Sequence, residues 1–123
     1  MNKTNIVAIT LAITSFSALA NKGEALGTTG RVDSVIEYCG GAGYFNERDK
    51  TTMQLENLKI TMGETGMSMK DVMNSHEYLR NYRNHVSYLH GLNEISFKGE
   101  CAKTIQVFAY ALKADDDLLG KSR

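Results

Sequence analysis

Sulfur and imidazole side chains gather in the middle of the chain, where they could bind a soft metal ion. Met69, Met73 and His76 are spaced i, i+4 and i+7, so one helix would place them on a single face, with Met62 and Met67 nearby in the sequence. Thioether and imidazole ligands together favour Cu(I). Methionine also fills irregular gaps in small helical cores. We therefore expect Met69, Met73 and His76 to pack in the core, with a copper site as the alternative.

The other histidines and the glycine-rich stretch do not form a recognisable catalytic or metal motif. His85 and His90 are five residues apart, which is not a same-face helical spacing, and they complete no zinc motif. The glycines of residues 40–43 lie within a helical pattern and lack the lysine of a phosphate-binding loop. The chain also has no nucleophile elbow, haem-attachment motif or zinc-protease motif. We therefore expect a protein that is not an enzyme.

A stretch rich in tyrosine and arginine is the best candidate for a binding surface. Tyr78, Arg80, Arg83 and Tyr88 bring two aromatic and two guanidinium groups together within about ten residues. These residue types are enriched at the centres of protein interfaces. An ordinary solvated helix face would have the same composition. We expect such a solvated face here, with a protein-binding face at these four residues as the alternative.

The first twenty residues have the pattern of an export signal. Lys3 provides a positive start, residues 6–13 form an apolar stretch, and residues 18–20 (Ala-Leu-Ala) form the small-x-small cleavage motif. The apolar stretch is much shorter than the roughly twenty residues that a membrane-spanning helix needs. We expect cleavage after Ala20 and a mature periplasmic or secreted chain without a membrane span. An uncleaved amphipathic N-terminus is the alternative.

Export would place the two cysteines in an oxidising compartment. Cys39 and Cys101 allow only one intramolecular pairing, so we predict a disulfide between them. The alternative is two free thiols. Closing a loop of roughly sixty residues would stabilise the fold by about 4 kcal/mol in the loop-entropy model.

Length and charge limit the classes of protein to which the mature chain can belong. Removal of a 20-residue signal from 123 residues leaves 103, which is enough for one small domain over residues 21–123. The mature part would carry 13 basic and 14 acidic residues. A nucleic-acid-binding protein needs a basic surface, so this balance argues against a nucleic-acid partner.

Apolar spacing predicts an all-α fold of about four helices. The first would continue from Thr29 to Ala42, after a flexible lead-in over residues 21–29 that contains two glycines. The second is expected over about 52–62, from a Thr-x-x-Gln capping box, and the fourth from about Glu100 to a break near Ala114. Residues 92–99 would form a loop. The disulfide would then link the first and last helices.

The third helix has the longest apolar stripe in the chain. It is predicted over 69–89, after a capping signal at Ser68 and before Gly91. Its apolar face would consist of Met69, Val72, Met73, His76, Leu79, Tyr82, Val86 and Leu89.

These features together predict a small exported helical protein that acts by binding another protein. Its general plan, a signal followed by about a hundred helical residues and one long-range disulfide, is similar to that of periplasmic acid-stress chaperones and some secretion-system immunity proteins. An inhibitor, a toxin-immunity factor and a stress chaperone are the roles that we consider. A periplasmic copper-binding protein is the alternative.

Overall fold

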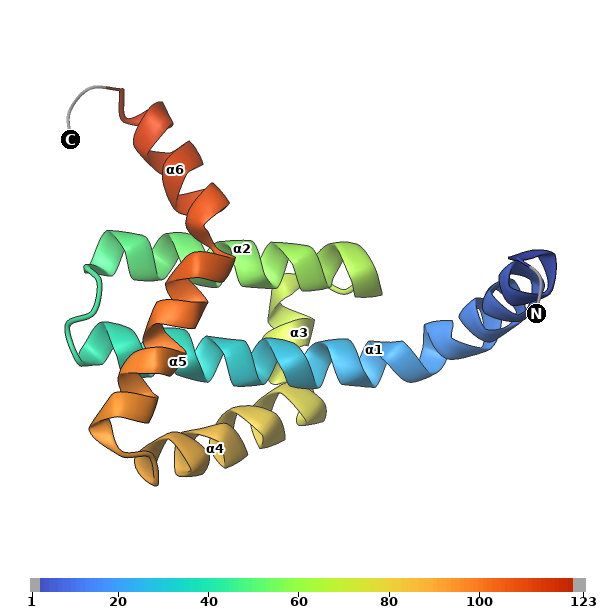
Figure 1. The fold of residues 1–123 in the computed structure, drawn as a ribbon, viewed down its shortest axis with the longest axis horizontal. Helices are drawn as coiled ribbons and strands as arrows, with labels where there is room; N and C mark the ends of the chain where they lie inside the picture. The colour runs from blue at the N-terminus through green and yellow to red at the C-terminus, as the bar shows by residue number, and fades with distance from the viewer. Residues whose placement is uncertain (1–2, 121–123) are drawn as a thin grey trace.

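The computed structural model describes residues 3–120 of the chain, with side chains from residue 21 onward (Figure 1). The predicted all-α fold is confirmed, because the chain is 85% helical and the described residues contain no strand. The described part has six helices, whereas about four were predicted: α1 (Lys3–Gly41), α2 (Glu47–Thr65), α3 (Met69–Asn74), α4 (His76–His90), α5 (Glu94–Val107) and α6 (Ala109–Leu118).

Helix α1 is the central element of the fold. It contacts α2, α4 and α5, while α3 joins α2 to α4 and α6 packs against α2 (Figure 1). The predicted export signal, residues 1–20, lies outside the residues whose side chains are described. Within the described residues, no helix has both the length and the apolar character to cross a bilayer.

Residues 21–29, expected as a flexible lead-in, are instead part of α1 and pack closely against α4. A Cβ atom on Gly30 would lie 2.3 Å from the backbone carbonyl oxygen of Tyr78, and one on Gly27 would lie 2.8 Å from the side-chain nitrogen of Asn81. Both distances are too short for a real Cβ contact. These glycines therefore serve a close helix crossing, and Leu26 and Thr29 beside them are buried.

Side chains from several faces of α1 take part in the core. One cluster joins α1 to α2, α3 and α4 through Leu26, Leu58, Val72 and Tyr78. A second surrounds the cysteines with Val35 and Leu89, and a third contains Ile36, Met53 and Phe108. A helix with buried residues on so many faces must be surrounded by the others, which is the observed arrangement.

The predicted disulfide is present. Cys39 of α1 is bonded to Cys101 of α5, with a Cα–Cα distance of 5.6 Å, and both residues are fully buried. Helix α5 is not the last helix, because the chain continues as α6 after the buried residue Phe108. The expected break near Ala114 is absent, since α6 runs through this position.

The predicted helix over 69–89 is interrupted at Ser75. The backbone of Ser75 is extended, with ψ 146°. Its hydroxyl donates to the carbonyl of Val72 at 2.7 Å and accepts from the N–H of Tyr78 at 3.3 Å. Ser75 thus ends α3 and begins α4, because a serine side chain can replace helical backbone hydrogen bonds.

Other helix ends depend on asparagine caps that were not predicted. Asn46 accepts from the N–H of Asp49 at 2.8 Å, so α2 begins earlier than residue 52. Asn93 accepts from the N–H of Ser96 at 2.8 Å, so α5 occupies most of the expected loop over 92–99. The predicted cap at Ser68 is confirmed, with its hydroxyl 3.2 Å from the N–H of Asp71.

Loss of the disulfide is expected to weaken the fold. Reduction, or the double substitution Cys39→Ser with Cys101→Ser, should lower the free energy of unfolding by about 2–4 kcal/mol, because the unfolded chain gains freedom. Urea unfolding followed by circular dichroism measures the change. Two alkylatable thiols in the oxidised native protein, or an unchanged urea midpoint after reduction, would contradict the prediction.

The close α1–α4 crossing predicts opposite effects for two glycine substitutions. Gly30→Ala should destabilise the protein by about 1–3 kcal/mol or more, because the new methyl group overlaps the Tyr78 carbonyl. Gly63→Ala in α2 is the matched control. Its Cβ would meet nothing within 4 Å, so it should stabilise by up to about 1 kcal/mol. Equal urea midpoints for the two variants would argue against the close crossing.

Candidate functional site

Among the residues whose side chains are described, Asp33 is the buried polar residue whose hydrogen bonding is incomplete. It lies on α1, one turn beyond Thr29, and is 5% exposed. The hydroxyl of Tyr78 donates to its Oδ2 atom, but its Oδ1 atom has no hydrogen-bond partner among the described residues. The other buried polar side chains, Thr29, Ser34, Asn57 and Thr61, are all hydrogen-bonded. An unbonded buried carboxylate oxygen is costly, so Asp33 needs an explanation beyond the fold.

Burial also changes the ionisation of Asp33. Removal of the carboxylate from water raises the pKa of Asp33 above its ordinary value. The hydrogen bond from Tyr78 opposes this shift, and the nearby carboxylate of Glu37 adds to it. The net result is a carboxylate whose negative charge is destabilised by its surroundings.

Asp33 lines an open cavity of about 320 Å³ between α1, α2 and the α3–α4 segment. The lining side chains are Asp33, Glu37, Gln54, Met73, Tyr78, Leu79 and Tyr82. Met73 and Leu79 are 40% and 43% exposed, whereas Asp33 is buried. The cavity therefore has an acidic inner end and an apolar rim.

The second carboxylate of the cavity already has partners. The Oε2 atom of Glu37 lies 2.8 Å from Nζ of Lys50 and accepts from Nε2 of Gln54 at 3.1 Å. The hydrogen bond to Glu37 raises the pKa of Lys50. The charge of Lys50 and a side-chain hydrogen-bond interaction from Gln54 also favour the ionised form of Asp33. Neither donor meets the distance and angle of a hydrogen bond to Oδ1. The Oδ1 atom of Asp33 is thus the buried carboxylate oxygen of this group that lacks a well-aligned donor among the described residues.

Two tyrosines of α4 form the aromatic wall. The ring centroids of Tyr78 and Tyr82 are 6.1 Å apart. Burial is the main cause that raises the pKa of each phenol, and the carboxylate of Asp33 raises both further. Tyr78 therefore stays protonated and donates to Asp33. The described lining residues offer carboxylate, amide and phenol oxygens, so they are suited to holding a hydrogen-bond donor or a cation.

The predicted binding face is divided between the core and the surface. Tyr78 is buried against Asp33, whereas Arg80, Arg83 and Tyr88 are exposed. The predicted helix over 69–89 continued through Ser75, so Leu79 was expected to face inward and Tyr78 outward. Because α4 begins anew at His76, the opposite holds. Tyr78 is therefore not part of a surface with Arg80, Arg83 and Tyr88.

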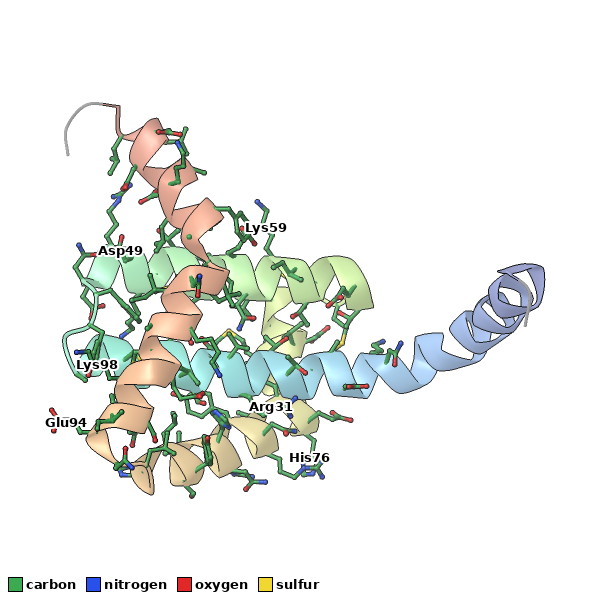
Figure 2. All side chains as sticks on the ribbon, in the orientation of Figure 1. Arg31, Asp49, Lys59, His76, Glu94 and Lys98 are labelled. Carbon is green, nitrogen blue, oxygen red and sulfur yellow. A yellow bond between two sulfur atoms is a disulfide. The ribbon has the colours of Figure 1, made fainter. Side chains whose placement is uncertain are left out.

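The methionine and histidine cluster is not in the core, which corrects that expectation. Met69, Met73 and His76 are all exposed, and Figure 2 shows His76 at the start of α4 on the side away from α1. Since α3 ends at Asn74, these residues do not share one helix, and the same-face argument for copper no longer applies. Among the described residues, no three His, Cys, Asp or Glu side chains form a metal-binding group. The copper site stays a prediction.

Sequence reasoning did not identify Asp33. The available signal was a carboxylate within an apolar helical segment, since Asp33 and Ser34 lie between Val32 and Val35. Such a position shows that the charge lies near the core boundary. Its partner Tyr78 is 45 residues away in the sequence, so the spacing alone could not join the two.

The bond between Tyr78 and Asp33 should contribute strongly to stability. Tyr78→Phe is expected to cost about 1–3 kcal/mol, because it leaves a buried carboxylate without a donor. Tyr88→Phe, on the exposed side of the same helix, should change stability by less than about 0.5 kcal/mol. In the Asp33→Asn background, the cost of Tyr78→Phe should fall. Urea unfolding measures the free energy of unfolding of each variant. If Tyr78→Phe lowered it by the same amount in the wild-type and Asp33→Asn backgrounds, the bond would not contribute to stability.

Functional residues cannot be transferred to this chain from a relative. No family model, no curated protein and no solved structure matches it. The inference of function therefore depends on the Asp33 cavity and the surface around it.

Proposed function

We propose that this protein is exported and acts by binding another protein through the Asp33 surface, which consists of Asp33, Met73, Leu79 and Tyr82. The observation that carries the proposal is the combination of a buried, incompletely bonded carboxylate with exposed apolar side chains at the same cavity. A monomer gains no stability from either feature. A protein partner would satisfy the carboxylate and cover the apolar rim.

The composition of the Asp33 surface resembles the centre of a protein interface. Interface energy is concentrated in a few aromatic and apolar groups in pockets from which the partner excludes water. Met73 and Leu79 would provide apolar area, while Tyr82 combines an aromatic ring with a hydroxyl group. The exposed Arg80 and Arg83 lie on the same helix as Leu79 and Tyr82. They would contribute polar contacts at the edge of the interface with the partner.

The disulfide supports the proposed location. A buried Cys39–Cys101 bond is consistent with an oxidising compartment outside the cytoplasm, as the leader over residues 1–20 predicts. In such a compartment a small helical binding protein would serve as an inhibitor, a toxin-immunity factor or a stress chaperone. We propose a role in this group, with cleavage after Ala20.

Binding through this surface can be tested with one substitution and a matched control. Leu79→Glu places a charge on the rim of the cavity, and Leu118→Glu makes the same change on α6, where Leu118 is 87% exposed. Mature wild-type and variant proteins are immobilised and exposed to the envelope fraction, and retained proteins are quantified by mass spectrometry. We expect one specific partner, whose recovery falls at least about tenfold with Leu79→Glu and is unchanged with Leu118→Glu.

Two outcomes would overturn the proposal. One is the absence of any partner whose recovery differs between wild type and Leu79→Glu. The other is a partner that is lost equally with both variants, which would indicate general electrostatic repulsion. Circular dichroism and urea unfolding confirm that both variants fold.

A further inference from the structure

We propose that the Asp33 cavity receives an arginine side chain, whose guanidinium group donates to the free Oδ1 atom of Asp33. This inference rests on the proposed function, since the arginine would belong to the partner protein. The guanidinium group is the part of the partner that the cavity would recognise.

The hydrogen-bond inventory of the cavity defines what the ligand must offer. Among the described residues, Asp33 Oδ1 has no donor in hydrogen-bond geometry and almost no solvent-accessible area, while Oδ2 is occupied by the Tyr78 hydroxyl. A ligand that reaches Oδ1 must therefore displace a side chain of the cavity lining. Glu37 is already bonded to Lys50 and Gln54. A ligand must therefore bring a donor to Asp33, and a positive charge on that donor would offset the carboxylate that burial destabilises.

The size and walls of the cavity suit one long side chain. A volume of about 320 Å³ lies at the lower end of the range of about 300–1,000 Å³ for ligand sites. Met73 and Leu79 at the rim would contact the methylene stem of an arginine. Tyr82 would present its ring to the planar guanidinium, which stacks on aromatic faces and attracts them as a cation.

A guanidinium group fits these features better than an ammonium group or a metal ion. It keeps its charge at all ordinary pH values and carries five donors in a planar fork, so it can bond to Asp33 while contacting Tyr82. Mg²⁺ and Ca²⁺ require several oxygen ligands in a closed arrangement. Here Glu37 is committed to Lys50, which leaves Asp33 as the one carboxylate of the cavity without a cationic partner.

The charges around Asp33 also predict how binding depends on pH. The groups that face it are Glu37 on α1, Lys50 on α2, and Tyr78 and Tyr82 on α4. Both phenols remain neutral because their pKa values are raised. When the pH falls through the raised pKa of Asp33, the carboxylate becomes neutral. Arginine binding should weaken over that pH range.

The test compares two small probes that differ in charge but have nearly the same shape. N-acetyl-arginine methylamide and N-acetyl-citrulline methylamide are titrated into the wild-type domain, and binding is followed by two-dimensional NMR of the backbone amides. Asp33→Asn removes the carboxylate charge with little change in shape. Asp115→Asn removes the same charge on α6, where Asp115 is paired with Arg48.

We expect the arginine probe to shift amide signals around Asp33, Tyr78 and Tyr82, with an affinity at least about tenfold higher than that of the citrulline probe. The preference should disappear in Asp33→Asn and persist in Asp115→Asn. Equal binding of the two probes, or a preference that survives Asp33→Asn, would overturn the inference. A lysine probe that binds more tightly than the arginine probe would overturn the choice of guanidinium. If Asp33→Asn does not fold, loss of the preference at low pH in the wild type provides the same test.

Failure of this inference and failure of the proposed function give different results. A partner that depends on Leu79 but not on Asp33 would leave protein binding intact and remove the arginine site. An arginine preference that depends on Asp33, without any partner that depends on Leu79, would leave the site intact and remove the proposed function.

Discussion

The close contact between Gly30 of α1 and the backbone of Tyr78 in α4 determines the geometry around Asp33. Because a Cβ atom at Gly30 would lie 2.3 Å from the Tyr78 carbonyl oxygen, only glycine allows α1 and α4 to approach so closely. This approach brings the Tyr78 hydroxyl to Asp33, three residues further along α1. The disulfide at Cys39 fixes the C-terminal end of α1 to α5. The cavity beside Asp33 is thus held by a close helix crossing and a covalent bond.

This arrangement separates what stabilises the protein from what we infer to be its function. The apolar clusters, the disulfide and the bonded polar pairs between α1 and α2 all have complete partners within the chain. Asp33 does not, and a neutral or apolar residue there would cost the fold less. A buried group that destabilises the fold is best explained by a ligand that donates the missing hydrogen bond. The exposed Met73 and Leu79 at the same cavity have the same explanation.

Local rules predicted those features that depend on nearby residues. The Ser68 cap and the helical character of the chain follow from sequence patterns, and the pairing of Cys39 with Cys101 follows because only one pairing exists. Residues 21–29 were predicted to be a flexible lead-in, because the role of their glycines depends on α4, about fifty residues away. The regular apolar spacing over 69–89 gave no sign of the helix break at Ser75. That single break reversed the inward and outward positions of Tyr78 and Leu79, and with them the candidate site.

The ionisation of Asp33 shows whether its carboxylate is left uncompensated in the free protein. The carboxyl carbon of Asp33 can be followed by NMR as a function of pH in the free protein and with a saturating arginine probe. We expect Asp33 to titrate above the ordinary value of 3.8 in the free protein, and bound arginine to lower its pKa. A pKa at or below 3.8 in the free protein would show that the carboxylate is already well compensated. That result would contradict the claim that it is held for a ligand.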